Sequence, residues 1–146
     1  ALKYAQWNGV AVFAAAGNDG GSVNYPAAYP EAIAVSALAP NETIADFSSR
    51  GNKVAFIAPG VGVNSTVPNG GYDEFAGTSM ATPHVAGVVA LMLEANPALT
   101  PDEVEARLKS SARAFPATCS QCGSGLVDAN AAVTAATGGG GGGGGT

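Results

Sequence analysis

The chain of 146 residues has little charge, few aromatic side chains and a single histidine. Lys and Arg together number six and Asp and Glu eleven, so charged residues make up 12% of the chain and the net charge is −5. Because no basic cluster is present, we expect no nucleic-acid partner. The longest apolar run, residues 85–93, is too short to span a bilayer, so we expect no membrane span either.

Cysteine is also scarce, and the only two, Cys119 and Cys122, form a C-x-x-C pair in a loop rich in Pro, Ser, Gln and Gly. A zinc site needs about four ligands, and the chain offers these two thiols and one remote histidine. A thioredoxin-like redox pair is expected at a strand-to-helix turn of a βαβ unit instead. We interpret the pair as a structural disulfide of a secreted protein. The two cysteines join each other or partners outside this segment.

Apolar residues make up 47% of the chain, which predicts a folded core. Strands that alternate with helices indicate an α/β layer structure. The expected buried strands are residues 10–16, 32–38 and 54–57, with a hairpin around 68–71. Four helices are expected. The first ends near residue 8, the second spans residues 78–95, the third begins at residue 101 and the fourth spans residues 129–136. The helix at 78–95 is apolar nearly all round, which predicts that it is buried.

The ends of the chain suggest a larger protein. No signal peptide or initiator Met precedes Ala1, and residues 138–145 are eight consecutive glycines. We therefore predict a folded unit over residues 1–137. A glycine-rich linker over 138–146 would lead towards a further C-terminal segment.

The stretch Gly77 to His84, with the sequence G-T-S-M-A-T-P-H, is typical of a nucleophilic serine at the start of a helix. A serine hydroxyl needs a base, and without one Ser79 is equally a helix cap. His84 follows five residues later, which in an α-helix places the two side chains roughly 140° apart. Side chains that meet on a helix are three or four residues apart. We therefore interpret His84 as a core histidine bonded to backbone, and not as the base.

A second candidate side chain, Asn18, comes directly after a predicted buried strand. Carboxyl ends of strands in open α/β sheets are where sites are built. The amide NH₂ of Asn18 could donate hydrogen bonds to an oxyanion there, and the alternative is a plain turn residue.

These features closely resemble the subtilisin-like serine proteases (subtilases), in the family's order and from the start of the chain to about residue 133. The segments that carry the resemblance are A-A-A-G-N-D-G (14–20), Y-P-A-A-Y-P (25–30), F-S-S-R-G (47–51), A-P-G-V (58–61) and G-T-S-M-A-T-P-H-V-A-G (77–87). The resemblance implies the C-terminal part of a three-layer fold, with a mostly parallel sheet flanked by helices.

The resemblance also implies roles for individual residues. Ser79 corresponds to the nucleophile, with its amide in the oxyanion hole, and Asn18 to the oxyanion-hole side chain. Thr78 would assist the hole, and Met80 would be the neighbour prone to oxidation. The implied pocket has Ala15, Ala16 and Gly17 as a wall, Asn24 at the bottom and Asp19 at the rim. The Tyr25–Pro26 bond would be cis.

Two departures from the family pattern limit this interpretation. The family's triad runs Asp, His, Ser along the chain, and both its Asp and its His would lie upstream of this segment. His84 corresponds to the histidine of the serine helix instead. The loop between Asn18 and Tyr25 is also short, which trims one rim of the pocket. An α/β-hydrolase is excluded because that fold needs a histidine after its serine, and none follows His84.

The implied function is a secreted, extracellular serine endopeptidase that acts on peptides or proteins. Its triad Asp and His would come from an N-terminal part of the same protease, so the chain alone should be inactive. The alternative is a non-catalytic, protease-like binding fragment. The chemistry requires no cofactor, and the family resemblance allows structural calcium in the whole enzyme. Carbonyls near Ala27 and Tyr29 belong to a weak cation site in the family, but Ala55 stands where many relatives carry an acidic ligand.

Overall fold

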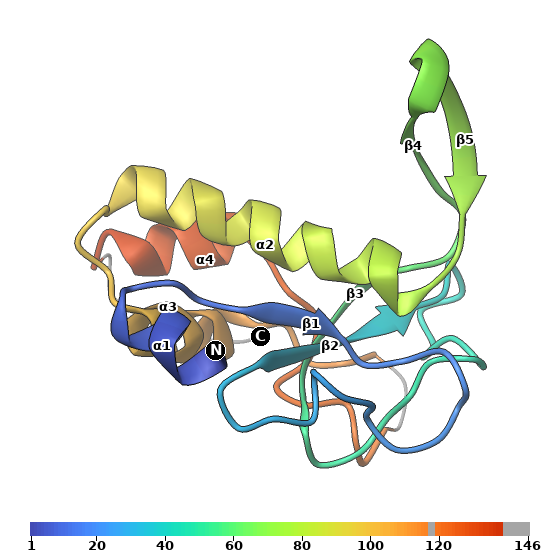
Figure 1. Cartoon of the computed structure of the whole chain (residues 1–146), viewed down its shortest axis with the longest axis horizontal. Helices are drawn as coiled ribbons and strands as arrows, with labels where there is room; N and C mark the ends of the chain where they lie inside the picture. The colour runs from blue at the N-terminus through green and yellow to red at the C-terminus, as the bar shows by residue number, and fades with distance from the viewer. Residues whose placement is uncertain (117–118, 139–146) are drawn as a thin grey trace, which may run out of the picture.

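The chain is organised around a three-stranded parallel sheet in a computed structural model that describes residues 1–116 and 119–138. Strands β1 (Phe13–Ala15), β2 (Ile33–Leu38) and β3 (Val54–Pro59) lie side by side in that order. Because the strands are parallel, their carboxyl ends meet at one edge of the sheet. Helix α2 (Thr78–Ala95) begins at this same edge (Figure 1).

Alternation along the strands divides the core between the two faces of the sheet. On one face Ile33, Val35 and Ala37 of β2 pack in a cluster with buried residues of α2, among them Val85 and Met92. On the other face a cluster of small residues packs with Leu2 of helix α1 (Leu2–Trp7); its buried members are Ala14, Ala27, Ala32 and Ala34. The prediction of a parallel sheet flanked by helices is confirmed.

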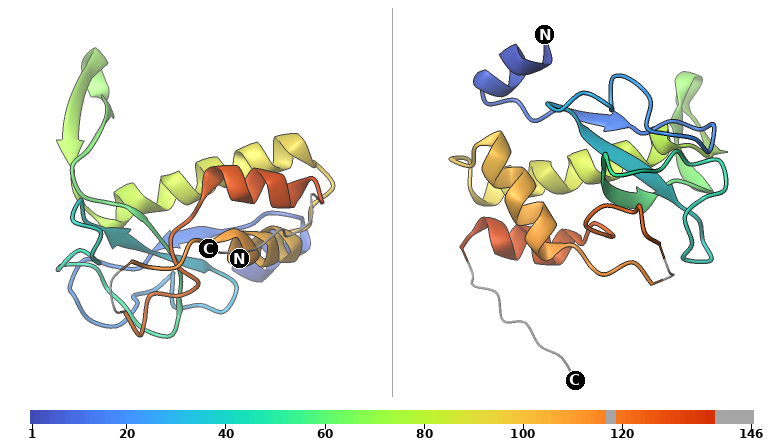
Figure 2. Two further views of the ribbon diagram at one scale, coloured as in Figure 1. Left: turned by 180° about the vertical axis from the view of Figure 1, so that it is seen from behind. Right: turned by 90° about the horizontal axis from the view of Figure 1, so that it is seen from below.

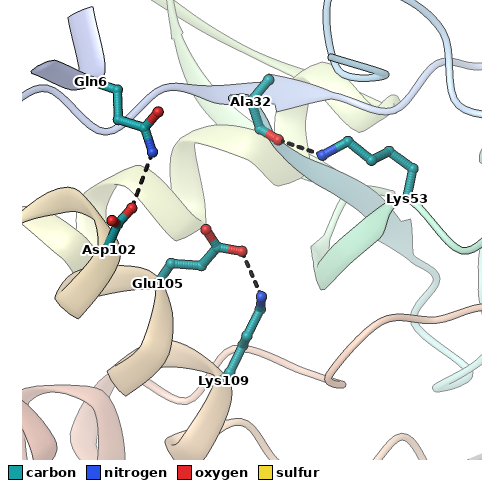
Figure 3. Close-up of polar contacts among 6 residues, drawn as sticks. All are labelled: Gln6, Ala32, Lys53, Asp102, Glu105 and Lys109. Carbon is teal, nitrogen blue, oxygen red and sulfur yellow. Dashed lines mark hydrogen bonds and ion pairs between the residues drawn. The ribbon is translucent and has the colours of Figure 1, made fainter. Parts of the chain in front are cut away.

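Two further helices pack beyond α2. Helix α4 (Ala129–Ala136) contacts both α2 and α3 (Pro101–Ser111). Thr100 and Glu103 form the predicted capping box at the start of α3. Figure 3 shows how polar contacts tie α1 to this region, since the Gln6 amide donates to Asp102 at 3.0 Å.

A hairpin leads from the sheet to α2. Strands β4 (Val63–Val67) and β5 (Gly71–Phe75) are antiparallel and are joined by the short 3₁₀ turn η1 (Pro68–Gly70), as predicted. The hairpin projects from the body of the molecule in Figures 1 and 2. Its side chains are half-buried or exposed, and its last strand ends two residues before Gly77.

Two predictions of burial are wrong. Helix α2 buries one side only, and on its other side Leu91 is 49% exposed. The predicted strand over residues 10–16 is shorter, and Val10 is 51% exposed. Leu91 lines a cavity shared with α4, not with the sheet. Val10 lies beside β1, which pairs with β2 on one side and with no second strand within residues 1–116 and 119–138. Apolar composition indicates what can be buried, but packing requires a neighbour.

The loop before α4 holds the two cysteines, which form a disulfide with each other. Cys122 is buried against Val54, Ile57 and Leu126, so the bonded pair anchors this loop under β3. The predicted glycine linker at 138–146 lies outside the described residues apart from Gly138. None of the described helices is both long and apolar enough to cross a bilayer.

Candidate active site

Ser79 lies in the first turn of α2 and its side chain is exposed. The first amides of a helix have no partner within the helix, so they point outward as donors. The turn is held from below, because the Gly77 N–H donates to the Gly60 carbonyl at 2.8 Å. Gly60 permits this approach, since a Cβ there would lie only 2.9 Å from the Gly77 carbonyl oxygen. The end of β3 therefore fixes the turn that carries Ser79.

The Asn18 side chain is oriented by Thr78, which is fully buried. The Asn18 Oδ1 accepts hydrogen bonds from the Thr78 N–H at 2.9 Å and from the Thr78 hydroxyl at 2.8 Å. The Thr78 Oγ1 in turn accepts from the Gly17 N–H at 3.2 Å. The two bonds from Thr78 to Asn18 engage the carbonyl end of the Asn18 side-chain amide. The NH₂ end of Asn18 is therefore the end that remains free to donate to a ligand.

Gly77 shows that two donors face a common space. A Cβ built on Gly77 would lie 3.4 Å from the Asn18 Nδ2 and 3.7 Å from the Ser79 backbone nitrogen. The Gly77 backbone, with φ 159° and ψ 161°, is in a region that is essentially restricted to glycine. Donors preorganised around one point can stabilise a negative charge that develops there.

The residue after Asn18 anchors the loop. The Asp19 carboxylate accepts bonds from the Asn24 amide at 3.0 Å, the Ser49 hydroxyl at 2.8 Å and the Gly21 N–H at 3.1 Å. These bonds, with that from Asn24 the largest contribution, lower the pKa of Asp19 below its usual value because they favour the ionised form. The carboxylate is thus charged at neutral pH and its oxygens are engaged within the loop.

Ser79 borders two open cavities. One, of about 330 Å³, lies between the hairpin and α2 and is lined in part by Asn64, Met80 and His84. The other, of about 670 Å³, runs along β1 and is largely apolar; Ala15 is the predicted pocket residue that lines it. The side-chain amide of Asn24 donates to Asp19. It also lies against Gly17, because a Cβ added to Gly17 would be 2.5 Å from the Asn24 Nδ2.

The interpretation of His84 is half right. Its Nδ1 lies 2.8 Å from the Met80 carbonyl oxygen, which confirms the bond to backbone. Because a carbonyl only accepts, this nitrogen carries the proton. The prediction that His84 is a core residue is wrong, since the side chain is exposed. It lies on the side of α2 that faces away from the sheet.

The residues near the expected weak cation site do not fit a metal ion. The Tyr29 carbonyl accepts from the Ala32 N–H at 3.1 Å, and the Ala32 carbonyl accepts from the Lys53 ammonium at 3.0 Å (Figure 3). A positive charge is thus already placed at this turn. Within the described ranges, no group of three or more His, Cys, Asp or Glu side chains could hold a metal ion. The Tyr25–Pro26 bond is cis, as predicted.

Sequence reasoning missed two residues of this site. Ser49 belongs to the quoted F-S-S-R-G segment but received no role, and Gly77 was identified only as part of the serine motif. The pattern Phe-Ser-Ser-Arg-Gly carries no periodicity that would reveal a contact with the Asn18 loop. Only the approach of loops that are distant in sequence shows it.

Comparison with known proteins agrees with this geometry. The chain is 50% identical over 133 residues to alkaline elastase YaB of Bacillus sp. (strain YaB), and this match covers 90% of this chain and 35% of that protein. It is 45% identical over 130 residues to subtilisin E of Bacillus subtilis (strain 168), and this match covers 86% of this chain and 34% of that protein.

A solved structure described as proteases from Pseudoalteromonas arctica PAMC 21717 superimposes with a TM-score of 0.88 at 42% identity, over 92% of this chain and 45% of that one. The chain thus spans between a third and a half of the length of these three proteins. The profile of the subtilase family matches residues 1–133. The chain therefore belongs to the subtilase family.

Proposed function

We propose that this chain carries the nucleophile and the oxyanion-binding groups of a serine endopeptidase. The observation that carries the proposal is the pair of donors beside Ser79. The Asn18 Nδ2 and the Ser79 nitrogen lie 3.4 Å and 3.7 Å from one point above Gly77. Two donors beside a hydroxyl form the arrangement that acyl transfer requires.

In the proposed mechanism the Ser79 Oγ attacks the carbonyl carbon of a peptide bond. A base takes the hydroxyl proton and later gives it to the leaving amine, and water then hydrolyses the acyl-enzyme. The negative charge of each tetrahedral intermediate would be held by the Asn18 amide and the Ser79 N–H. The Thr78 hydroxyl assists by fixing the carbonyl end of Asn18.

The base and its orienting carboxylate, we infer, come from an N-terminal part of the same protein. Two observations support this inference. His84 is the only histidine in the sequence, and its Nδ1 is already bonded to the Met80 carbonyl. The cavity of about 330 Å³ beside Ser79 is open to a further segment. The isolated chain would then lack proteolytic activity, while the complete protein would need no cofactor for the chemistry.

Substrate binding is proposed for the loop that follows β1. Ala15, Ala16 and Gly17 would form one wall of the pocket, Asn24 its base and Asp19 its rim. The neutral Asn24 amide favours apolar or medium-sized polar side chains before the cleaved bond, and Asp19 would tolerate a basic one. An extracellular location is supported by the Cys119–Cys122 disulfide, since such bonds persist in oxidising compartments.

The test is Ser79→Ala in the complete protein that contains this chain, with Ser110→Ala as the matched control. Ser110 is exposed on α3 and bonds the Arg107 carbonyl, so its loss should leave kcat unchanged. Ser79→Ala should remove hydrolysis of a chromogenic peptide down to the residual catalysis, about 10³–10⁴ over water, that such sites keep without their triad. Full proteolysis by Ser79→Ala would refute the assignment. A parent protein that binds peptides without cleaving them would favour the non-catalytic binding fragment instead.

A further inference from the structure

Ser49 contacts the residues on both sides of Asn18. It lies in the connection between β2 and β3 and is fully buried. Its backbone N–H donates to the Gly17 carbonyl at 2.9 Å. Its hydroxyl donates to the Asp19 Oδ1 at 2.8 Å. One residue therefore holds the backbone before Asn18 and the side chain after it.

Ser49 is itself fixed to the sheet. Its carbonyl accepts from the hydroxyl of Ser36, a fully buried residue of β2, at 2.7 Å, and from the Ser48 hydroxyl at 3.4 Å. The fit against the loop is close, since a Cβ on Gly17 would lie 2.8 Å from the Ser49 Oγ. Ser49 thus ties the residues on both sides of Asn18 to the sheet, beside the backbone bonds that Phe47 and Arg50 make to Gly20 and Gly21.

We propose that Ser49 is a positioning residue, which holds the Asn18 loop so that the amide NH₂ faces the point above Gly77. This inference rests on the proposed function of Asn18. Thr78 fixes the side chain of Asn18, whereas Ser49 holds the Gly17 carbonyl and the Asp19 carboxylate on either side of it. Both constraints are needed because a donor displaced by a fraction of an ångström loses much of its effect on the transition state.

The experiment is a double-mutant cycle between Ser49→Ala and Asn18→Ala in the complete protein, with kcat and KM measured on a peptide substrate. We expect Ser49→Ala to lower kcat roughly tenfold, a fraction of the loss caused by removing the oxyanion donor itself, with KM changed less than about twofold. In the Asn18→Ala background the same substitution should have no further effect on kcat. A purely structural role would give the same loss in both backgrounds.

The matched control is Ser111→Ala. Ser111 is half-buried at the end of α3, and its hydroxyl donates to the Leu108 carbonyl at 3.2 Å without contacting Asp19 or Ser49. Its removal should lower the melting temperature and leave kcat unchanged. If Ser49→Ala fails to fold, Asp19→Ala removes the same bond, together with those from Asn24 and Gly21, and should show the same coupling with Asn18→Ala. Equal losses in both backgrounds, or an unchanged kcat in folded Ser49→Ala, would overturn the inference.

Crystal structures of the parent and of Ser49→Ala separate this inference from the proposed function. In the parent the Asn18 Oδ1 lies 2.9 Å from the Thr78 nitrogen. A parent that proves inactive would refute only the proposed function. The positioning inference would then depend on whether Asn18 moves away from Thr78 in the variant, as we expect. An unmoved Asn18 would refute it.

Discussion

Gly77→Ala is the substitution that tests the proposed oxyanion site most directly. The added methyl would lie 3.4 Å from the Asn18 Nδ2, 3.5 Å from the Met80 Sδ and 3.7 Å from the Ser79 nitrogen. These are ordinary van der Waals distances, so the protein has room for the methyl group. The space that it fills is the one that the two donors share. A substrate oxyanion would therefore be excluded from the site without the loss of either donor.

The size of the effect follows from the donors. Removing one such donor in a subtilisin, a member of this chain's own family, lowers kcat about 10²–10³-fold. Because the methyl blocks access to both donors, we expect a loss of about 10³-fold in Gly77→Ala. The backbone at Gly77 adds strain on the order of 1–3 kcal/mol, which lowers the melting temperature but not the kcat of molecules that remain folded.

The assay is steady-state hydrolysis of a peptide anilide by the complete protein, with the folded fraction measured by thermal unfolding. The control is Gly70→Ala at the tip of the hairpin. Gly70 has φ +79° and an added Cβ there meets nothing within 4 Å, so it introduces backbone strain without contact with the site. Gly70→Ala should lose stability and keep kcat. A kcat for Gly77→Ala within about threefold of the parent would refute the reasoning.

Three further predictions follow from contacts around the site. Thr78→Val removes the hydroxyl that holds the Asn18 carbonyl, and should lower both kcat and the free energy of unfolding, the latter by about 1–3 kcal/mol in urea titrations. Since the folded-state pKa of Asp19 is lowered, its contribution to stability should be complete above its unfolded pKa of about 3.9 and be lost as pH falls through the folded value. Asp19→Asn should flatten this dependence in urea titrations between about pH 5 and pH 2, and an unaltered pH profile would contradict the assignment. Lys53→Met removes the bond to the Ala32 carbonyl and should lower stability by about 1 kcal/mol. Added calcium should not restore it, and recovery of the melting temperature with calcium would show that a metal site exists there.

Local patterns in the sequence were sufficient for most of the secondary structure. The capping box at Thr100, the hairpin turn at 68–70 and the helix from Thr78 to Ala95 all appear as expected. Each depends on residues within a few positions of one another, so propensity and turn chemistry determine them. The exposure of His84 and of one side of α2 was not predictable in this way. Burial depends on which surfaces find a neighbour in the folded chain, and among the described residues the side of α2 that carries His84 and Leu91 lacks one over much of its length.

The sequence by itself determined the family and the two side chains most suited to the chemistry, Ser79 and Asn18. It did so because the motifs around them are contiguous. Only the tertiary structure decided that the Asn18 NH₂ and the Ser79 N–H lie beside one space, and that Ser49 supports the loop that carries Asn18. The physical reason is that these relations depend on hydrogen bonds between loops that are 30 and 60 residues apart in sequence. Such bonds require the sheet to bring the ends of its strands to one edge.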